Sequence, residues 1–566
     1  MTQVPTRIRV RARNPQGERA LEGAGVHPLL ARLLAARGCQ APPAGRASEL
    51  LPPTTLLDID VAAKRIADAI EREERIVIVA DYDCDGATAG ALGVRGLRAL
   101  GAQVDYLVPN RFTTGYGLTP AVVDLARALE PRLLVTVDNG IASIDGVAHA
   151  RAAGIDVVIT DHHLPGAQLP MALAIVNPNQ PGCRFPSKDL AGVGVMFYVL
   201  MATRAELRER GRYAQAPQPR LDTLLDLVAL GTVADLVRLD ANNRLLVQLG
   251  LDRIRNGQTS PGILALARVA GREARTLTTG DLGYALAPRI NAAGRLADMR
   301  IGIECLLTDD ATRAFFLAEQ LDRINAERRN VQDDMNERAA ALVLDRYDPA
   351  HQRSIVAFDP GFHAGVTGLV ASRLREAHHR PAIVFAPTTE GMLSGSGRSI
   401  PGFHLRDAID LVTKRAPALV QRFGGHAMAA GLTIRAEDLP EFERHFEAVA
   451  TALIGADALE RVLDVDGPLE VGYIQPQIAQ LLDAQIWGQA FAPPVFYDTW
   501  DVVNQRVMRD KHVRATLEKD GRRVEAWAFN YAEPLPARAA LAFRLALNEY
   551  NGAITARLVI ERVLDA

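Results

Sequence analysis

The chain has 566 residues and a formal net charge of -3, and these two values exclude several classes of protein. A charge so close to zero predicts no general affinity for polyanions, so any contact with nucleic acid must come from local basic surfaces. The length is too great for one hydrophobic core and indicates roughly three or four domains. No run of about 18 apolar residues predicts a membrane span, and residues 1–13 lack the apolar centre of a secretory signal.

The four cysteines are scattered along the chain, and no Cys-x-x-Cys pair occurs. This spacing argues against a zinc site or a disulfide framework and favours the reducing cytoplasm. At the N-terminus arginines alternate with apolar residues, which predicts one strand with a basic face formed by Arg7, Arg9, Arg11 and Arg13. We favour a solvated edge strand there over a contact with nucleic acid.

Residues 57–180 alternate short apolar runs with segments of helical spacing. The expected strands are 76–80, 105–108, 133–137, 156–160 and 172–176, and the expected helices are 87–100, 120–129 and 144–153. This alternation is typical of βαβ units and predicts an α/β domain with a doubly wound parallel sheet. Such sheets bind their ligands beyond the carboxyl ends of the strands.

Acidic residues and histidines follow three of these strands. They are Asp81, Asp83 and Asp85 after the first, Asp138 after the third, and Asp161, His162 and His163 after the fourth. On an extended segment the three carboxylates of the first group would face one side, where they would repel each other unless a cation neutralised them. Oxygen ligands with histidine suit Mn²⁺ or Mg²⁺, so we predict a two-metal site. The alternative is a loop in which an aspartate caps a helix at Gly86, beside buried, hydrogen-bonded histidines.

Two later segments could extend this site. Asp235 ends an apolar helix, where an isolated aspartate is more often a cap than a ligand. Segment 288–295 places Arg289, Asn291 and Arg295 around small residues, which indicates a surface that holds phosphate. A salt-bridged surface turn is the alternative for that segment.

Residues 311–346 contain neither glycine nor proline and carry a helical apolar pattern, which predicts one long helix that joins two domains. A second α/β unit follows, with expected strands at 354–358 and 381–385. It contains two glycine-rich segments, 394–399 and 423–426. We interpret them as loops that cradle phosphate, with Ser396, Arg398 and His426 as the contacting residues.

The C-terminal part consists of short alternating stretches that predict a small β-barrel. Between residues 506 and 523, seven basic residues outweigh three acidic ones. This basic run favours contact with single-stranded nucleic acid over a merely solvated face. The aromatic candidates for stacking against bases are Trp500, Trp527, Phe529 and Tyr531.

The ordered motifs resemble those of the DHH phosphoesterase superfamily: Asp-Tyr-Asp-Cys-Asp-Gly, Val-Asp-Asn-Gly, Asp-His-His, Gly-Thr-Val-Ala-Asp and Phe-Gly-Gly-His-Ala. From residue 45 onward the chain is similar to the single-strand-specific DNA exonucleases of that superfamily. The resemblance implies five parts: an N-terminal extension (1–50), a DHH catalytic domain (51–310), a connecting helix (311–346), a DHHA1 substrate-binding domain (347–456) and an OB-like nucleic-acid-binding domain (457–566).

The resemblance also implies a 5′-to-3′ exonuclease that releases mononucleotides in DNA recombination and repair. Two Mn²⁺ or Mg²⁺ ions would be held by Asp83, Asp85, Asp138, His162 and Asp235, with Asp138 between the ions. Val79 stands where many members have a histidine, which leaves Asp81 as either a ligand or a supporting group. Asp161 would support the site, and His163 would contact the scissile phosphate.

A pocket for the 5′ terminal phosphate is implied at Arg111, Ser396 and Arg398, and His426 would help to offset charge on the phosphoryl oxygens. A groove between the two α/β domains would exclude duplex DNA. The expected partners are single-stranded DNA, a single-stranded-DNA-binding protein and a RecQ-type helicase, with the enzyme itself a monomer.

Two other functions stay open. One is a hydrolase of the same superfamily that acts on small substrates, such as a pyrophosphatase, a cyclic-dinucleotide phosphodiesterase or an oligoribonuclease. The terminal β-domain and the long helix argue against it, because a small substrate needs no remote strand-binding surface. The other is a non-catalytic scaffold that binds DNA, and the presence of every expected carboxylate argues against it.

Overall fold

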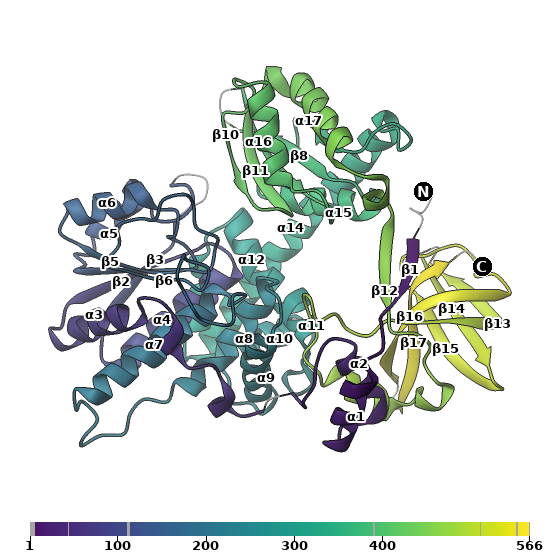
Figure 1. Cartoon of the computed structure of the whole chain (residues 1–566), viewed down its shortest axis with the longest axis horizontal. Helices are drawn as coiled ribbons and strands as arrows, with labels where there is room; N and C mark the ends of the chain where they lie inside the picture. Colours follow the sequence, from purple (N-terminus) through teal and green to yellow (C-terminus); the bar gives the residue numbers. More distant parts are fainter. Residues whose placement is uncertain are drawn as a thin grey trace. The chain divides into compact units, whose positions relative to one another are not determined.

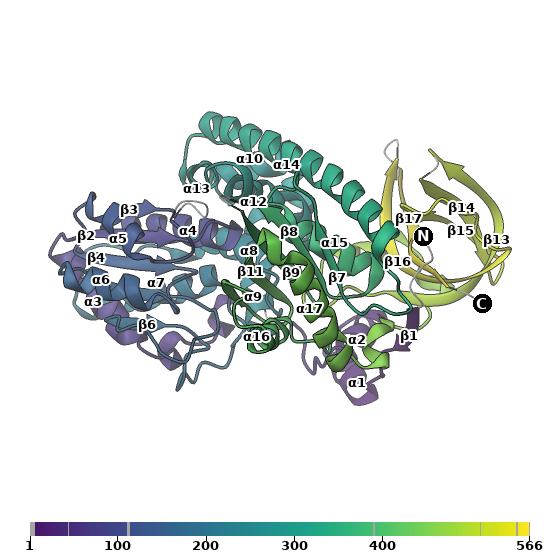
Figure 2. The ribbon, with the colours of Figure 1, turned by 90° about the horizontal axis from the view of Figure 1, so that it is seen from above.

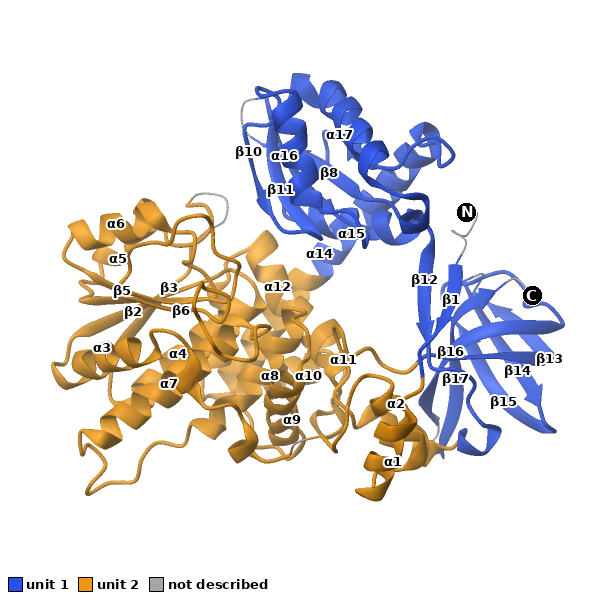
Figure 3. Ribbon diagram, in the orientation of Figure 1, with its two compact units in different colours: residues 1–12, 326–474, 495–566 blue, residues 13–325, 475–494 orange. Residues whose placement is uncertain are grey.

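The computed structural model describes residues 6–43, 45–109, 114–388, 391–509, 511–550 and 553–564. The chain divides into two compact units, each assembled from segments that are distant in the sequence (Figure 3). One unit contains residues 13–325 and 475–494. The other contains residues 1–12, 326–474 and 495–566. No helix in the described ranges combines the length and the apolar character needed to cross a membrane.

A parallel sheet forms the centre of the unit that contains residues 13–325 and 475–494, which is orange in Figure 3 (Figure 1). Its strands lie in the order β3-β2-β4-β5-β6, and each pairs in parallel with its neighbour. Their bounds are β2 (Arg75–Ala80), β3 (Gln103–Leu107), β4 (Leu133–Val137), β5 (Asp156–Thr160) and β6 (Ala174–Val176). The predicted parallel α/β sheet is confirmed, and two of its strands have the predicted bounds.

Helices cover both faces of this sheet. Ile76, Ile78 and Ala80 of β2 join the apolar cluster of one face, whereas Val77 and Val79 join the cluster of the other. The first face is covered by α3 (Ile59–Glu71), α4 (Cys84–Leu100) and α7 (Gly192–Glu209), and the second by α5 (Pro120–Arg127) and α6 (Ile144–Ala152). Burial on both faces explains why these strands appear as continuous apolar runs.

A helical layer follows the sheet in the sequence. It comprises α8 (Leu225–Ala234), α9 (Ala241–Arg255), α10 (Pro261–Val269), α11 (Thr279–Asp281), α12 (Ala287–Leu296) and α13 (Arg300–Leu307). Segment 288–295 therefore lies in a helix, and the alternative of a surface turn is wrong. The N-terminal helices α1 (Pro15–Gly23) and α2 (Pro28–Ala35) and the late helix α18 (Pro476–Asp483) belong to the same unit.

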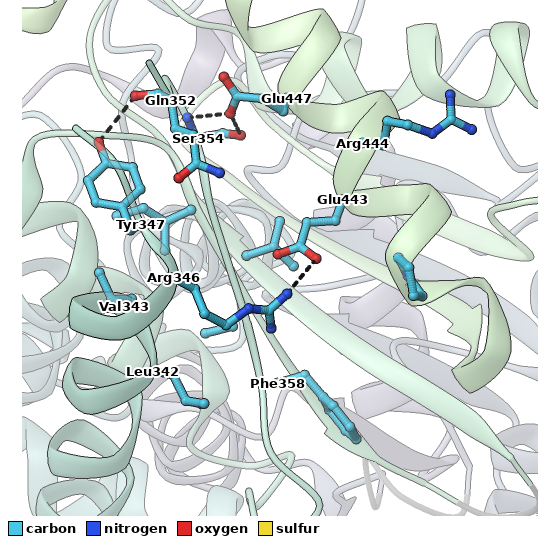
Figure 4. Close-up of a pocket in the computed structure, with 14 residues that line it drawn as sticks. Leu342, Val343, Arg346, Tyr347, Gln352, Ser354, Phe358, Glu443, Arg444 and Glu447 are labelled. Carbon is cyan, nitrogen blue, oxygen red and sulfur yellow. Dashed lines mark hydrogen bonds and ion pairs between the residues drawn. The ribbon is translucent and has the colours of Figure 1, made fainter. Parts of the chain in front are cut away.

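The long helix α14 (Ala311–Arg346) is continuous, as its lack of glycine and proline predicts (Figure 2). At its C-terminal end it lines a cavity of about 320 Å³ with strand β7 (Ile355–Phe358) and helix α17 (Leu439–Leu453) (Figure 4). An ion pair between Arg346 and Glu443, 3.3 Å apart, ties α14 to α17. Glu447 accepts hydrogen bonds from the backbone N–H of Arg353 and Ser354 at 2.8 and 2.9 Å. The charged groups of this cavity therefore connect α17 both to α14 and to the residues that precede β7.

The second α/β unit contains a mixed sheet in the order β10-β11-β9-β8-β7. The remaining strands are β8 (Ala382–Pro387), β9 (Met392–Arg398), β10 (Arg422–Gly425) and β11 (Ala429–Arg435), and the other helices are α15 (Thr367–His378) and α16 (Leu405–Arg415). Only the β7–β8 pair is parallel among the described pairings of this sheet.

The interpretation of the two glycine-rich segments as loops is wrong. Residues 394–398 lie in β9 and residues 423–425 in β10, so both segments are mainly strand. A Cβ at Gly395 would lie 2.5 Å from the ring of Phe385, and one at Gly397 would lie 2.7 Å from Leu405. These glycines are thus needed for tight packing against the sheet, and a phosphate cradle does not explain them.

The C-terminal strands close into a barrel in the order β13-β14-β15-β17-β16. Their bounds are β13 (Phe496–Met508), β14 (His512–Lys519), β15 (Arg522–Ala528), β16 (Arg538–Tyr550) and β17 (Ala553–Leu564). Trp500 is 1 % exposed and packs edge-on against Phe543, so its proposed stacking on a base is wrong. Phe529 is 45 % exposed and stacks on Trp527, with ring centroids 5.6 Å apart.

Acidic neighbours neutralise much of both basic surfaces. Strand β1 (Thr6–Val10) pairs in parallel with β12 (Arg461–Val465), and Arg9 donates to Asp464 through two nitrogens. In the barrel, Arg514 lies 3.0 Å from Glu525 and Arg523 lies 2.7 Å from Glu518. Arg7 and Arg9 therefore lie on a paired strand, whereas Arg11 and Arg13 follow it, and each of the four arginines has an acidic partner.

Candidate metal centre

The first acidic motif forms a turn into a helix. Strand β2 ends at Ala80, Asp83 caps α4 by accepting a hydrogen bond from Gly86 N–H at 3.0 Å, and Asp85 lies in the first helical turn. The expectation of one extended segment from Asp81 to Asp85 is therefore wrong. The capping alternative holds for Asp83 and leaves its second carboxylate oxygen available to the site.

Asp85 is buried, and both of its oxygens accept backbone N–H groups from the start of α7. Gly192 donates at 2.6 Å and Val193 at 2.9 Å. The N-terminus of a helix carries partial positive charge, so it stabilises an ionised carboxylate. A Cβ at position 192 would lie 2.5 Å from Asp138, which explains the glycine there.

Asp138 follows β4 with a positive φ of 62°. Its neighbour Asn139 donates from one side-chain nitrogen to the carbonyls of Val79 at 3.0 Å and Val137 at 2.9 Å. Asn139 thus ties the ends of two neighbouring strands together and fixes the turn that carries Asp138.

Asp161 organises the turn that contains both histidines. One of its oxygens accepts hydrogen bonds from the backbone N–H of His162 and His163, at 2.7 and 3.1 Å, and also lies 2.7 Å from His163 Nδ1. The other oxygen accepts the backbone N–H of Ile141 at 2.9 Å. Asp161 also lies outside the three candidate ligand groups found among the described residues, which agrees with a supporting role.

The side chains that follow β2, β4, β5 and α8 converge. His162 Nε2 lies 3.1 Å from Asp138 Oδ1, 3.5 Å from Asp235 and 4.0 Å from Asp85. Three groups bring their ligand atoms within 4.8 Å of one another; they are Asp138 with His162 and His163, Asp85 with His162 and Asp235, and Asp81 with Asp83 and Asp138. The predicted ligands are thus neighbours in the structure.

Two buried atoms at the centre of this cluster indicate a cation. Asp138 Oδ1 and His162 Nε2 are inaccessible to water, and neither forms a hydrogen bond within the described ranges. Unsatisfied buried polar atoms are costly, and a metal ion would satisfy both. The donor set of carboxylate oxygens with one imidazole fits Mn²⁺ or Mg²⁺.

The pKa values of the cluster also indicate that its negative charges are not compensated. Burial and the neighbouring Asp235 raise the pKa of Asp85 to about 7, and burial and Asp83 raise the pKa of Asp235 to about 7. Burial lowers the pKa of His162, which favours the neutral imidazole that a metal requires. Burial opposes charge on His163, but the hydrogen bond to Asp161 together with the negative charges of Asp161, Asp235 and Asp81 raises that pKa to about 9.

Replacing Asp235 with asparagine is expected to stabilise the metal-free protein at pH 8. Its pKa rises from 3.8 in the unfolded chain to about 7 in the fold, so stability is lost as the pH increases from about 4 to about 7. Asparagine removes that loss. We expect the free energy of unfolding to increase by about 1–3 kcal/mol at pH 8 and by less at pH 5. Thermal unfolding in the presence of a chelator measures this change in stability. A variant that is less stable than wild type at pH 8 would show that the ionised Asp235 carboxylate does not destabilise the metal-free protein.

Segment 288–295, which was predicted to hold phosphate, instead contacts the backbone of the first acidic turn. Asn291 Oδ1 accepts the backbone N–H of Cys84 at 2.8 Å, and a Cβ at Gly294 would clash with the carbonyl of Tyr82. Arg289 forms an ion pair with Asp322 at 2.9 Å. Asn291 and Arg289 are thus engaged inside the protein, and half-buried Arg295 lies in the last turn of α12.

Ser396 and Arg398 lie together at the start of α15, in the unit that is blue in Figure 3. Ser396 Oγ accepts a hydrogen bond from Thr367 Oγ1 at 3.0 Å. A Cβ at Gly368 would lie 2.9 Å from the guanidinium of Arg398, which therefore lies over the helix N-terminus. This arrangement of hydroxyls, a guanidinium and a helix N-terminus suits phosphate. His426 lies in the exposed turn between β10 and β11, and Arg111 lies outside the described residues.

Several residues of the site were missed by sequence reasoning. They include Asn139, Gly192 and Thr367, which act through the backbone or through another side chain. The signals available were weak, because Asn-Gly is common turn chemistry and small residues before a helix are frequent. Only the fold brings these residues to the carboxylates or to Arg398.

The fold and the site define a DHH-type phosphoesterase. The model of the DHH family, N-terminal domain, matches residues 75–232, that of the DHHA1 domain matches residues 351–452, and that of the RecJ OB domain matches residues 465–562. The chain is 44 % identical to the single-stranded-DNA-specific exonuclease RecJ of Escherichia coli K12, over 95 % of this chain and 96 % of that protein. The Salmonella typhimurium protein of the same name gives the same identity and the same coverage.

Solved structures agree with this comparison. RecJ from Thermus thermophilus in complex with Mn²⁺ superposes with a TM-score of 0.83 at 30 % identity, covering 99 % of this chain and 80 % of that one. The Mg²⁺ complex gives a TM-score of 0.78 at 28 % identity, covering 99 % and 79 %. The chain therefore belongs to the RecJ family.

Proposed function

We propose that this protein is a divalent-metal-dependent exonuclease that degrades single-stranded DNA from its 5′ end and releases mononucleotides. Its RecJ relatives are named single-stranded-DNA-specific exonucleases and align along nearly the whole chain. The observation that carries the proposal is the convergence of Asp85, Asp138 and Asp235 on His162, where two buried atoms have no hydrogen bond to any described residue.

Two Mn²⁺ or Mg²⁺ ions would be held by the five predicted ligands, Asp83, Asp85, Asp138, His162 and Asp235. Asp138 would serve both ions, since its carboxylate belongs to two of the three candidate ligand groups. When bound, the ions polarise the phosphodiester and lower the pKa of water for in-line attack. Asp81 would hold the turn, and its hydrogen bond from the backbone N–H of Tyr82 at 2.7 Å supports this role.

His163 would act on the substrate. The hydrogen bond to Asp161 favours the protonated imidazole, which would offset the charge that grows on a phosphoryl oxygen. Asp161 stabilises that cation through Nδ1, which assigns the donation to phosphate to Nε2. The two histidines thus have different functions despite being adjacent in sequence.

The 5′ terminal phosphate would be bound by Ser396 and Arg398, with Thr367 as a further contact. Arg295 and His426 are additional candidates for substrate binding, whereas Arg289 and Asn291 would act by placing α12 and the first acidic turn. The barrel would hold the strand farther from its end. There the exposed Phe529 stacked on Trp527 offers a surface for bases.

The wider setting rests on the family resemblance. We propose that the enzyme acts as a monomer in the cytoplasm, in DNA recombination and repair, with a single-stranded-DNA-binding protein and a RecQ-type helicase as partners. The five predicted parts, 1–50, 51–310, 311–346, 347–456 and 457–566, would be the working divisions of the chain. A small-substrate hydrolase and a scaffold are not favoured by the relatives found.

An assay on matched substrates tests this function. Single-stranded DNA labelled at the 5′ or the 3′ end, the same sequence as a blunt duplex, and pyrophosphate are each incubated with the protein and Mn²⁺. We expect the 5′ label to appear at once as a mononucleotide and the 3′ label to remain on shortening strands. Faster turnover of pyrophosphate, or early release of the 3′ label, would refute the proposal.

A further inference from the structure

The turn that contains His162 and His163 is hydrogen-bonded to β6 and to the residues that follow it. Strand β6 ends beside it, and Asp161 N–H donates to the carbonyl of Val176 at 3.1 Å. After β6, Asn177 donates from its side chain to the carbonyl of His163 at 2.9 Å, and Asn179 donates to the carbonyl of His162 at 2.7 Å. Each histidine carbonyl therefore accepts a hydrogen bond from a different asparagine.

The two asparagines are also bound to each other and to their own segment. Asn177 Oδ1 accepts the backbone N–H of Asn179 at 2.7 Å, and Asn179 donates a second hydrogen bond to the carbonyl of Lys188 at 3.1 Å. Lys188 in turn donates to the carbonyls of Pro178 at 2.7 Å and Cys183 at 2.8 Å. Asn177 is fully buried and Asn179 is half-buried. The side-chain amide supplies both the acceptor and the donor that position 177 uses.

This arrangement fixes the peptide groups of both histidines at both ends. Asp161 accepts their N–H groups, and the asparagines donate to their carbonyls. The direction of each Cα–Cβ bond follows from the peptide planes on either side of it. A ligand or donor that moves by a fraction of an ångström loses much of its effect, so this restraint has a catalytic consequence.

We infer that Asn177 and Asn179 are positioning residues for the histidine pair. Asn179 holds His162 in the place where its Nε2 meets Asp138, and Asn177 holds His163 in the place where its imidazole meets the phosphate. The inference depends on the roles proposed above for the two histidines. It assigns a function to two polar residues that are not metal ligands themselves.

The two asparagines predict different defects. Asn179→Ala is expected to increase the Mn²⁺ dissociation constant about tenfold and to decrease kcat by about 10–100-fold, because His162 is a proposed ligand. Asn177→Ala is expected to decrease kcat by a similar factor but to leave the Mn²⁺ dissociation constant within about threefold, because His163 is not a ligand. In both variants KM for single-stranded DNA should stay close to the wild-type value.

Lys188→Met provides the matched control. Lys188 stabilises the same segment, yet its ammonium donates to the carbonyls of Pro178 and Cys183 and not to those of the histidines. Calorimetric titration of the metal-free full-length proteins with MnCl₂, thermal unfolding, and steady-state cleavage of single-stranded DNA are compared for all variants. If Asn179→Ala and Lys188→Met lower Tm equally and Asn179→Ala binds Mn²⁺ as wild type does, the asparagine is merely structural and the inference is wrong.

The outcome is separable from that of the proposed function. If wild type binds Mn²⁺ but cleaves no single-stranded DNA, the proposed function fails, while the difference in Mn²⁺ affinity between Asn179→Ala and Lys188→Met still decides the positioning of His162. Should the buried Asn177 variant fail to fold, Asn179→Ala alone decides the inference, because position 179 is half-exposed.

Discussion

Replacing Asp138 with alanine is expected to abolish cleavage of single-stranded DNA while binding of the strand persists. The Asp138 carboxylate lies within 4.8 Å of ligand atoms in two separate groups, so its loss removes a contact to each proposed ion. We expect kcat to decrease by at least about 1,000-fold, which corresponds to ~4 kcal/mol of transition-state stabilisation. Cleavage of a 5′-labelled strand measures kcat, and fluorescence anisotropy measures binding.

Asp145→Ala is the control for this variant. Asp145 is an exposed residue in the first turn of α6 and lies outside every candidate ligand group. It should cleave and bind as wild type does. Cleavage at the wild-type rate by Asp138→Ala would show that the shared carboxylate is not needed, and the assignment of the ligands would be wrong.

His163→Gln is expected to produce the second-largest defect, with a decrease in kcat of about 100–1,000-fold. Glutamine keeps a donor but cannot carry the positive charge that Asp161 maintains on His163. Because His163 is assigned to the phosphate, Mn²⁺ affinity should change by no more than about threefold. Steady-state kinetics and calorimetric titration with Mn²⁺ measure the two effects.

His162→Gln serves as the comparison, because it is expected to weaken Mn²⁺ binding. His162 Nε2 lies among three carboxylates, so this change should weaken Mn²⁺ binding by about 10–100-fold. If His163→Gln weakens Mn²⁺ binding as strongly as His162→Gln does, the two histidines share one role and the division between them is wrong.

The parallel sheet and the acids at its edge could be predicted because their signals are local. Strands buried on both faces must be continuously apolar, and 133–137 and 156–160 were therefore predicted with their actual bounds. The polar residues that follow such runs must lie at the carboxyl edge of the sheet. That reasoning located Asp138 and His162 without any knowledge of the packing.

Other features depend on tertiary contacts and could not be predicted. A glycine at position 395 is compatible both with a loop that binds phosphate and with a strand that packs against Phe385, so the sequence does not distinguish the two. Trp500 and Phe529 both follow the alternation of a strand, but one lies in the barrel core and the other is exposed. The start of α4 at Cys84 was missed because alternating aspartates suggest an extended segment, whereas Asp83 is in fact a helix cap.

The supporting amides form a third class. Asn139, Asn177 and Asn179 all follow strands and would pass as ordinary turn residues. Their importance comes from the carbonyls to which they donate, which belong to neighbouring strand ends or to the histidines. Sequence reasoning found the groups that would touch a metal ion but not the groups that hold them in place.

The most direct test of the metal centre is anomalous diffraction from crystals of the wild-type protein soaked in MnCl₂, with Asp138→Ala crystals treated in the same way. We expect two Mn²⁺ peaks in the wild type, both adjacent to Asp138 and one of them adjacent to His162 Nε2, about 3.5–4 Å apart. At least one peak should disappear in the variant. Mn²⁺ peaks elsewhere on the protein, or two unchanged peaks in Asp138→Ala, would contradict a metal centre built on the strand-end carboxylates.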